Sequence, residues 1–242
     1  MNEPAPTRRT PSRRRAVLDA NVLIPGSLRD TLLRAEEANL YEPFWSAETL
    51  REVERNLIPL LMHHADPEAR AKYLIDTLIA EFPAATVDDY AEHLPVLTNH
   101  PGDRHVLAAA IAVRAPIIVT FNVRHFPVAA LAPHRVRAQT PDRFLTMLFK
   151  ERPSTMVRPL LIEQGEQLRR PRTLAATLDT LSQHAPNFAR PGAGATACLV
   201  CRRAGRQEVF FSPFSLLPSP FSPLSTLHSP RPSPRQIPPQ RG

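Results

Sequence analysis

One short apolar run constrains the fold of this chain more than any other stretch. It reads Val17-Leu18-Asp19-Ala20-Asn21-Val22-Leu23, with an acid and an amide two positions apart. An unpaired carboxylate in such surroundings costs several kcal/mol, so the rest of the chain has to supply a partner for Asp19. The partner that best explains this acid is a metal ion. That hypothesis requires further acids at matching places downstream.

Apolar strands and amphipathic helices alternate through residues 16–150. The patterns predict strands at 16–24, 41–45, 85–87, 117–120 and 135–138, and helices at about 28–38, 46–61, 68–82, 104–114 and 140–149. Short buried strands that alternate with helices indicate an α/β fold, with a mostly parallel sheet covered by helices on both faces. Such sheets bind ligands beyond the carboxyl ends of their strands, where we expect Asp19 and Asn122 to lie.

The two ends of the chain differ in composition from this central part. Residues 1–15 are rich in Pro and Arg and are predicted to form a disordered basic arm. Residues 151–189 are predicted to be a helical extension, with one helix around Leu160, Leu161 and Leu168 and another around Leu174, Leu178 and Leu181. Two short helices cannot bury a core alone, so they should pack on the main domain or on a partner. Residues 190–242 are predicted to be a disordered Pro/Ser/Arg-rich tail, which is either functional or a frameshifted end.

The net charge of +7 is unevenly distributed along the chain. Residues 1–15 carry a net +4 and residues 151–242 a net +7, whereas residues 16–150 hold 13 Lys and Arg against 17 Asp and Glu. Electrostatic attraction to nucleic acid is therefore expected of the ends rather than of the acidic central part. No apolar run approaches the ~18 residues of a membrane span. Cys198 and Cys201 form no disulfide framework and only half of a zinc site, so a cytoplasmic protein is expected.

Four polar residues follow strands or begin helices in a way that suggests one common site. They are Asp19, Glu52, Asp103 and Asn122. All but Asp19 also have an ordinary structural interpretation: Asp103 as a helix N-cap, Glu52 as part of a solvated helix face, and Asn122 as a turn residue. Taken together they would form an all-oxygen site, which favours Mg²⁺ or Mn²⁺. A metal held in this way suits phosphodiester chemistry, because it activates a water and offsets charge on the leaving oxygen.

The motifs around these residues resemble the PIN domain in order and spacing, over about residues 15–150. The four motifs are Leu-Asp19-Ala-Asn21-Val-Leu, Ser-Ala-Glu-Thr-Leu-Arg-Glu52-Val, Gly-Asp103-Arg-His-Val-Leu and Val-Thr120-Phe-Asn122-Val-Arg-His-Phe-Pro. The branch most similar to this chain is the VapC-type toxin ribonucleases, which often have a helical extension.

The resemblance implies a three-layer α/β/α fold and a Mg²⁺- or Mn²⁺-dependent endoribonuclease. It also implies an RNA substrate, a cognate antitoxin and a homodimer. Asp19, Glu52 and Asp103 match the family's metal-binding carboxylates. Asn122 stands where many members carry a fourth acid, so a second metal is expected to bind more weakly. Asn21 and Thr120 match positions that orient the carboxylates, although strand-end capping would also explain them.

Other interpretations of the same residues remain open. Arg104, Arg124 and His125 flank the predicted site and are candidates for RNA contact, or are ordinary surface residues. Asn122 favours the alternative of a non-catalytic PIN-like module that binds RNA or protein. A metal phosphatase or a DNA nuclease on a similar sheet is a third hypothesis.

Overall fold

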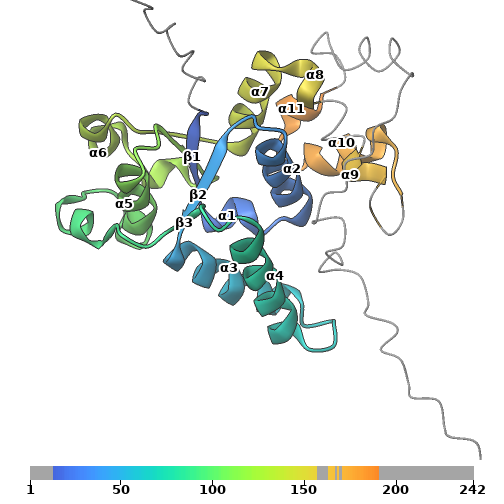
Figure 1. Cartoon of the computed structure of the whole chain (residues 1–242), viewed down its shortest axis with the longest axis horizontal. Helices are drawn as coiled ribbons and strands as arrows, with labels where there is room; N and C mark the ends of the chain where they lie inside the picture. The colour runs from blue at the N-terminus through green and yellow to red at the C-terminus, as the bar shows by residue number, and fades with distance from the viewer. Residues whose placement is uncertain (1–12, 157–162, 167, 169–170, 191–242) are drawn as a thin grey trace, which may run out of the picture.

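The computed structural model describes residues 13–156, 163–166, 168 and 171–190, and its centre is a single parallel sheet (Figure 1). The sheet has five strands in the order β3-β2-β1-β4-β5. All four neighbouring pairs are parallel, which confirms the predicted sheet. The strands are β1 (Arg15–Leu18), β2 (Glu42–Ser46), β3 (Thr86–Val87), β4 (Ile117–Val119) and β5 (Arg137–Gln139).

Helices connect these strands and cover both faces of the sheet. The α-helices of the central part are α1 (Ala20–Leu23), α2 (Gly26–Glu37), α3 (Ala47–Leu60), α4 (Pro67–Glu81), α5 (Arg104–Ala112), α6 (Val128–Leu131) and α7 (Pro141–Glu151). Short 3-10 turns are η1 (Ala91–Val96), η2 (Pro101–Asp103), η3 (Val123–His125) and η4 (Ala132–His134). The C-terminal helices are α8 (Pro153–Thr155), α9 (Glu163–Glu166), α10 (Leu174–Ser182) and α11 (Pro186–Ala189).

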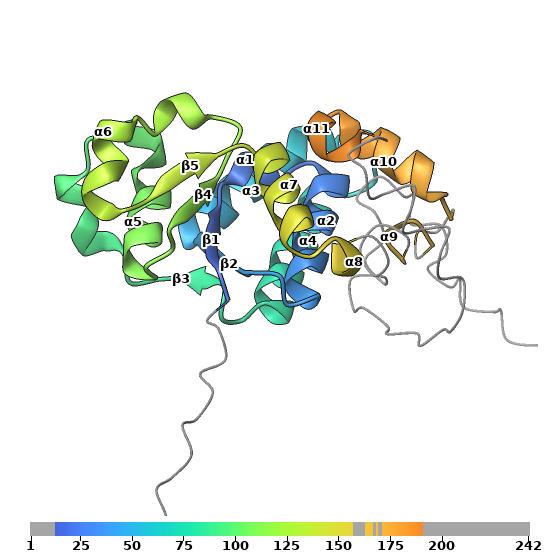
Figure 2. The same ribbon diagram turned by 90° about the horizontal axis from the view of Figure 1, so that it is seen from above.

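Two hydrophobic cores lie on opposite faces of the sheet, as alternation along each strand requires. Ala16 and Leu18 face a core shared with α2, α3, α4 and α7, whereas Val17 and Ile118 face a smaller core built on α5. Figure 2 shows α5 and α6 on one side of the strands and α2, α4 and α7 on the other. The three-layer α/β/α fold is therefore confirmed.

The first strand is shorter than we predicted, and this difference determines where the acid lies. The apolar run does not continue as a strand to residue 24, because β1 ends at Leu18 and α1 begins at Ala20. Asp19 stands between them in an extended conformation, and its backbone N–H donates to the carbonyl of Val119 over 3.1 Å. Hydrophobic pattern alone cannot distinguish a buried strand from one buried helical turn, which explains the error.

The first N-terminal residues that the structure describes form ion pairs with acids of the domain. Arg15 belongs to β1 rather than to a disordered arm. Arg13 lies 3.3 Å from Glu36, Arg14 lies 2.8 Å from Glu151, and Arg15 lies 3.3 Å from Glu42. Residues 1–12 of the predicted arm lie outside the described residues.

The described part of the C-terminal extension packs on the domain. Leu181 and Phe188 belong to the same core as β1 and α7. Asp142, in the first turn of α7, accepts hydrogen bonds from the backbone N–H groups of Asn187 and Phe188, at 2.9 and 2.8 Å. The other predicted helix is only partly described, as α9, and the predicted tail with Cys198 and Cys201 lies outside the described residues. None of the described helices is long and apolar enough to cross a membrane.

Candidate active site

Asp19 is held in a network of neutral hydrogen-bond donors at the carboxyl end of β1. Its side chain is buried, with 3% of its surface exposed. Asp19 Oδ2 accepts from the Thr120 hydroxyl at 2.6 Å and from Asn21 Nδ2 at 2.7 Å. The side-chain amide oxygen of Asn21, Oδ1, in turn accepts a hydrogen bond from the backbone N–H of Phe121 at 3.1 Å. These bonds fix one oxygen of Asp19, Oδ2.

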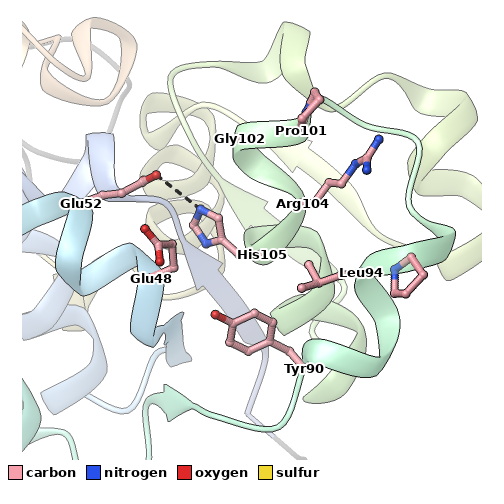
Figure 3. Close-up of a pocket in the computed structure, with 9 residues that line it drawn as sticks. Glu48, Glu52, Tyr90, Leu94, Pro101, Gly102, Arg104 and His105 are labelled. Atoms are coloured by element: carbon pink, nitrogen blue, oxygen red, sulfur yellow. Dashed lines mark ion pairs between the residues drawn. The ribbon is translucent and has the colours of Figure 1, made fainter.

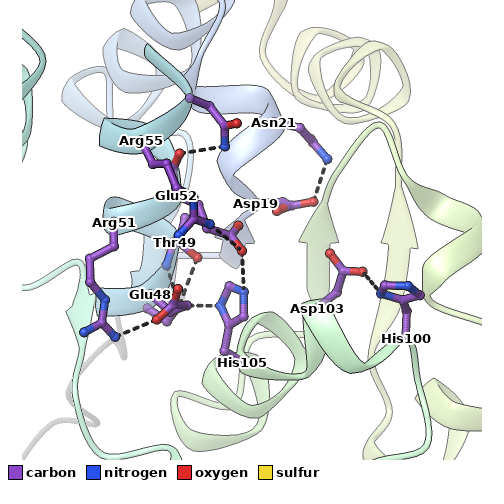
Figure 4. Close-up of polar contacts among 12 residues, drawn as sticks. Asp19, Asn21, Glu48, Thr49, Arg51, Glu52, Arg55, His100, Asp103 and His105 are labelled. Carbon is purple, nitrogen blue, oxygen red and sulfur yellow. Dashed lines mark hydrogen bonds and ion pairs between the residues drawn. The ribbon is translucent and has the colours of Figure 1, made fainter. Parts of the chain in front are cut away.

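Two further acids act on Asp19 electrostatically. Burial raises the pKa of Asp19 above its ordinary value, the hydrogen bond from Thr120 lowers it, and the charges of Asp103 and Glu52 raise it again. Figure 4 shows Asp19 between Glu52 on α3 and Asp103 at the start of α5. The structure thus brings three of the predicted residues together at one edge of the sheet. Because like charges repel there, the site is suited to a cation.

A buried histidine, His105, which follows Asp103 closely in the sequence and was expected only to flank the site, lies beside Glu52. His105 Nδ1 is 2.7 Å from the hydroxyl of Ser46, and His105 Nε2 is 3.6 Å from Glu52 Oε1. Ser46 also caps α3, because its hydroxyl accepts the backbone N–H of Thr49 at 3.0 Å. His105 Nε2 has no hydrogen-bond partner among the described residues. The acid that it faces, at 3.6 Å, is Glu52. The buried face of α5, on which His105 lies, was the only sequence signal for this role.

Figure 3 shows that Glu52 and His105 line an open cleft between α3, η1 and the start of α5. The cleft has a volume of about 620 Å³, and Glu48, Tyr90 and Arg104 also line it. Arg104 and Glu52 thus line the same cleft, and contact of Arg104 with RNA stays a prediction. Of the three acids at the edge of the sheet, only Glu52 lines this cleft.

Asp103 does not cap α5, although its position after Pro-Gly suits a cap. Its side chain makes no cap hydrogen bond. Instead Asp103 Oδ2 lies 2.8 Å from His125 Nδ1 and 3.0 Å from His100 Nδ1. His125 is thus placed beside a predicted ligand. His100 was not predicted, because no pattern in the sequence joins it to His125.

Asn122 lies near the site through its backbone. It follows β4, and its N–H donates to the Thr120 hydroxyl at 2.9 Å. Its side chain makes no cap hydrogen bond for the turn η3 that follows. Arg124 is exposed one turn further along the same loop. The structure therefore places Asn122 next to the Asp19 network, and Arg124 on the surface beside it.

The residues present fit a divalent cation. The donors that hold Asp19 are both neutral, and the neighbouring acids raise its pKa, so negative charge accumulates on one buried edge. Carboxylate, hydroxyl and amide oxygens are the donors that Mg²⁺ and Mn²⁺ prefer. Asp19, Glu52 and Asp103 are the residues that could hold such an ion.

A parallel α/β/α sheet with acids at its carboxyl edge is the architecture of a PIN domain. The family model of the PIN domain matches residues 15–124, so the chain contains a PIN domain, as its motifs predicted.

Within this region the chain is similar to a curated protein of Mycobacterium tuberculosis called "Putative ribonuclease VapC50". The two are 37% identical over 103 residues, which cover 41% of this chain and 59% of the relative. The similarity to a VapC-type protein that the motifs predicted is therefore confirmed, over part of each chain. No solved structure matches the chain.

Proposed function

We propose that this protein is a Mg²⁺- or Mn²⁺-dependent endoribonuclease and the toxin of a toxin–antitoxin pair. The observation that carries the proposal is the group formed by Asp19, Glu52 and Asp103, in which two acids raise the pKa of the buried third. The PIN domain and the similarity to a protein named as a putative ribonuclease support the same conclusion.

In this proposal the three carboxylates hold the metal ion and the chain orients them. When bound, the ion lowers the pKa of a water and offsets negative charge on the phosphodiester. Thr120 and Asn21 hold Oδ2 of Asp19 and would fix the orientation of this carboxylate towards the ion. His105 lies 3.6 Å from Glu52 and would help to orient it when an ion is bound, because partners of a metal-binding carboxylate fix its position.

The RNA has to reach this site against an acidic surface. Residues 16–150 carry a net charge of −4. Arg13 to Arg15 lie at the start of β1, whereas Asp19 follows the end of this strand. We therefore propose that Arg104 and Arg124 contact the RNA backbone near the cleft, together with basic residues of a second copy in a homodimer. A cognate antitoxin would inhibit the protein.

Replacing Asp19 with Asn tests the proposal. The variant keeps an oxygen that can accept from Thr120 and Asn21, but it loses the charge that holds the metal. We expect both Mn²⁺-dependent cleavage of single-stranded RNA and growth arrest on expression to be abolished. The matched control is Asp76→Asn, which changes an exposed acid on α4 that pairs with Lys72. Equal cleavage by Asp19→Asn and by the wild type, in preparations free of host nuclease, would refute the proposal.

The alternative of a non-catalytic module is favoured by one residue, Asn122, which leaves that side of the site without a carboxylate. Under this alternative the chain would bind RNA without cleaving it, and calorimetry would detect no Mn²⁺ binding. Cleavage of DNA or of small phosphomonoesters in preference to RNA would instead indicate a DNA nuclease or a metal phosphatase.

A further inference from the structure

We propose that His100, Asp103 and His125 form a second cation site, which binds a divalent transition-metal ion such as Co²⁺ or Zn²⁺. The Nδ1 atoms of His100 and His125 lie 3.0 and 2.8 Å from the same oxygen, Asp103 Oδ2. All three donor atoms lie within 4.8 Å of one another. Two nitrogen donors and one oxygen donor thus converge from two separate loops.

The backbone holds these loops together without any ion. The N–H of His100 donates to the carbonyl of His125 over 3.2 Å, which joins the loop before α5 to the loop after β4. The N–H of Asp103 donates to the carbonyl of His100 over 2.9 Å, and that of His125 donates to Asn122 over 2.9 Å. Because the three backbones are fixed relative to one another, little further ordering is needed to bind an ion.

The type of donor determines which ions fit. Imidazole suits the later transition-metal ions from Fe²⁺ to Zn²⁺, whereas Mg²⁺, Ca²⁺ and Mn²⁺ prefer oxygen ligands. Neighbouring ligands about 2.1 Å from an ion lie about 3 Å apart, which is close to the separations of the two histidines from Asp103. The two rings are stacked, with centroids 4.3 Å apart and an angle of 18° between their planes. One ion cannot lie in both planes, so one ring has to turn. His100, whose side chain is 53% exposed, has the space to do so.

Asp103 would connect this site to the acidic one. Figure 4 shows Asp103 between Asp19 and His100, with one carboxylate oxygen directed to the histidine. A carboxylate shared in this way occurs where two ions lie about 3.5–4 Å apart and act on the same phosphodiester. Binding of the ion by the histidines does not depend on the chain being a nuclease, but an effect on cleavage rests on the proposed function.

Titration of the full-length Asp19→Asn variant with Co²⁺ tests the inference, because this variant weakens the acidic site and leaves the three ligands intact. We expect one Co²⁺ to bind, with the visible absorption of an ion that has nitrogen ligands. Adding His100→Asn and His125→Asn should weaken this binding by at least about tenfold, since even indirect partners of metal ligands contribute 10- to 100-fold. His100→Asn alone, at an exposed side chain, should also weaken it and is not expected to disturb folding.

The matched control is His63→Asn with His64→Asn in the same background. This is another pair of adjacent imidazoles, with ring centroids 4.1 Å apart, and it should leave Co²⁺ binding unchanged. A Cys198→Ser, Cys201→Ser variant should also bind Co²⁺ normally. Co²⁺ binding that survives loss of both His100 and His125, or that is lost in either control, would overturn the inference. If the wild type does not cleave RNA but the Asp19→Asn variant still binds Co²⁺ through these histidines, the proposed function is refuted and the second cation site is supported.

Discussion

The charge on Asp19 should destabilise the metal-free protein, and removing that charge should stabilise it. Asp19 is 3% exposed and lies close enough to Glu52 and Asp103 for their charges to raise its pKa. An Asn side chain can still accept from Thr120 and Asn21, so Asp19→Asn removes the charge with little loss of hydrogen bonding. Relieving an uncompensated buried polar group is worth about 1–3 kcal/mol. We therefore expect Asp19→Asn to raise the free energy of unfolding in EDTA by that amount.

The effect should depend on pH in a defined direction. Below the ordinary pKa of 3.8 the carboxyl is protonated in both the folded and the unfolded protein, so it contributes no penalty. As the pH rises through the raised pKa of the folded state, the unfolded protein loses its proton more readily, and the wild type loses stability. Asp19→Asn lacks this loss, so the difference between the two proteins should grow from acid towards neutral pH.

Thermal unfolding with and without Mn²⁺ measures both parts of this prediction. A gain of 1 kcal/mol should raise Tm by about 2–4 °C in a protein of this size. Mn²⁺ at about 1,000 times its Kd should stabilise the wild type by about 4.1 kcal/mol and leave Asp19→Asn nearly unchanged, which reverses their order. A lower Tm for Asp19→Asn in EDTA at pH 7, or an equal response of both proteins to Mn²⁺, would refute the reasoning.

Three further variants test other parts of the site and the fold. His105→Gln removes the imidazole that lies 3.6 Å from Glu52, and it should raise the Mn²⁺ concentration needed for cleavage about 10- to 100-fold. An unchanged Mn²⁺ requirement would show that His105 does not support Glu52. Asn122→Asp should tighten Mn²⁺ binding measured by calorimetry, and weaker binding would place this side chain away from the ion. Asp142→Ala removes the acceptor of two backbone hydrogen bonds from the first turn of α11. It should lower the free energy of unfolding in urea by about 1–2 kcal/mol and leave cleavage unchanged. Unchanged stability would show that α11 packs on the domain without this contact.

The sheet and the acidic edge could be predicted because both depend on strong local patterns. Apolar segments separated by amphipathic helices leave few arrangements other than a parallel sheet, and the carboxyl ends of its strands then share one edge. Asp19 could be recognised because an acid in an apolar run has no ordinary explanation. Its position between the end of a strand and the start of a helix could not be predicted, because one turn of buried helix after Leu18 has the same apolar composition as a longer strand.

The contacts of the histidines around the site could not be predicted, although His125 was expected to flank it, because these contacts join distant segments of the chain. His100 and His125 meet only after the loop before α5 packs against the loop after β4. His105 lies on a helix so apolar that nothing in the pattern separates a packed imidazole from one that faces Glu52. Asp103 shows the same limit: its position after Pro-Gly predicts a cap, and the nearby histidines occupy its carboxylate instead.

The placement of charge explains why a metal and a second polymer-binding element are both needed for the proposed activity. β1 has only four residues, so its first and last residues are separated by about 10 Å. Arg13 to Arg15 at the start pair with acids of the domain, whereas Asp19 at the end faces Glu52 and Asp103. An RNA phosphate at the acidic edge therefore meets net negative charge unless a cation occupies it. The bound ion would thus serve both the chemistry and the approach of the substrate, which is why the loss of Asp19 should affect binding as well as cleavage.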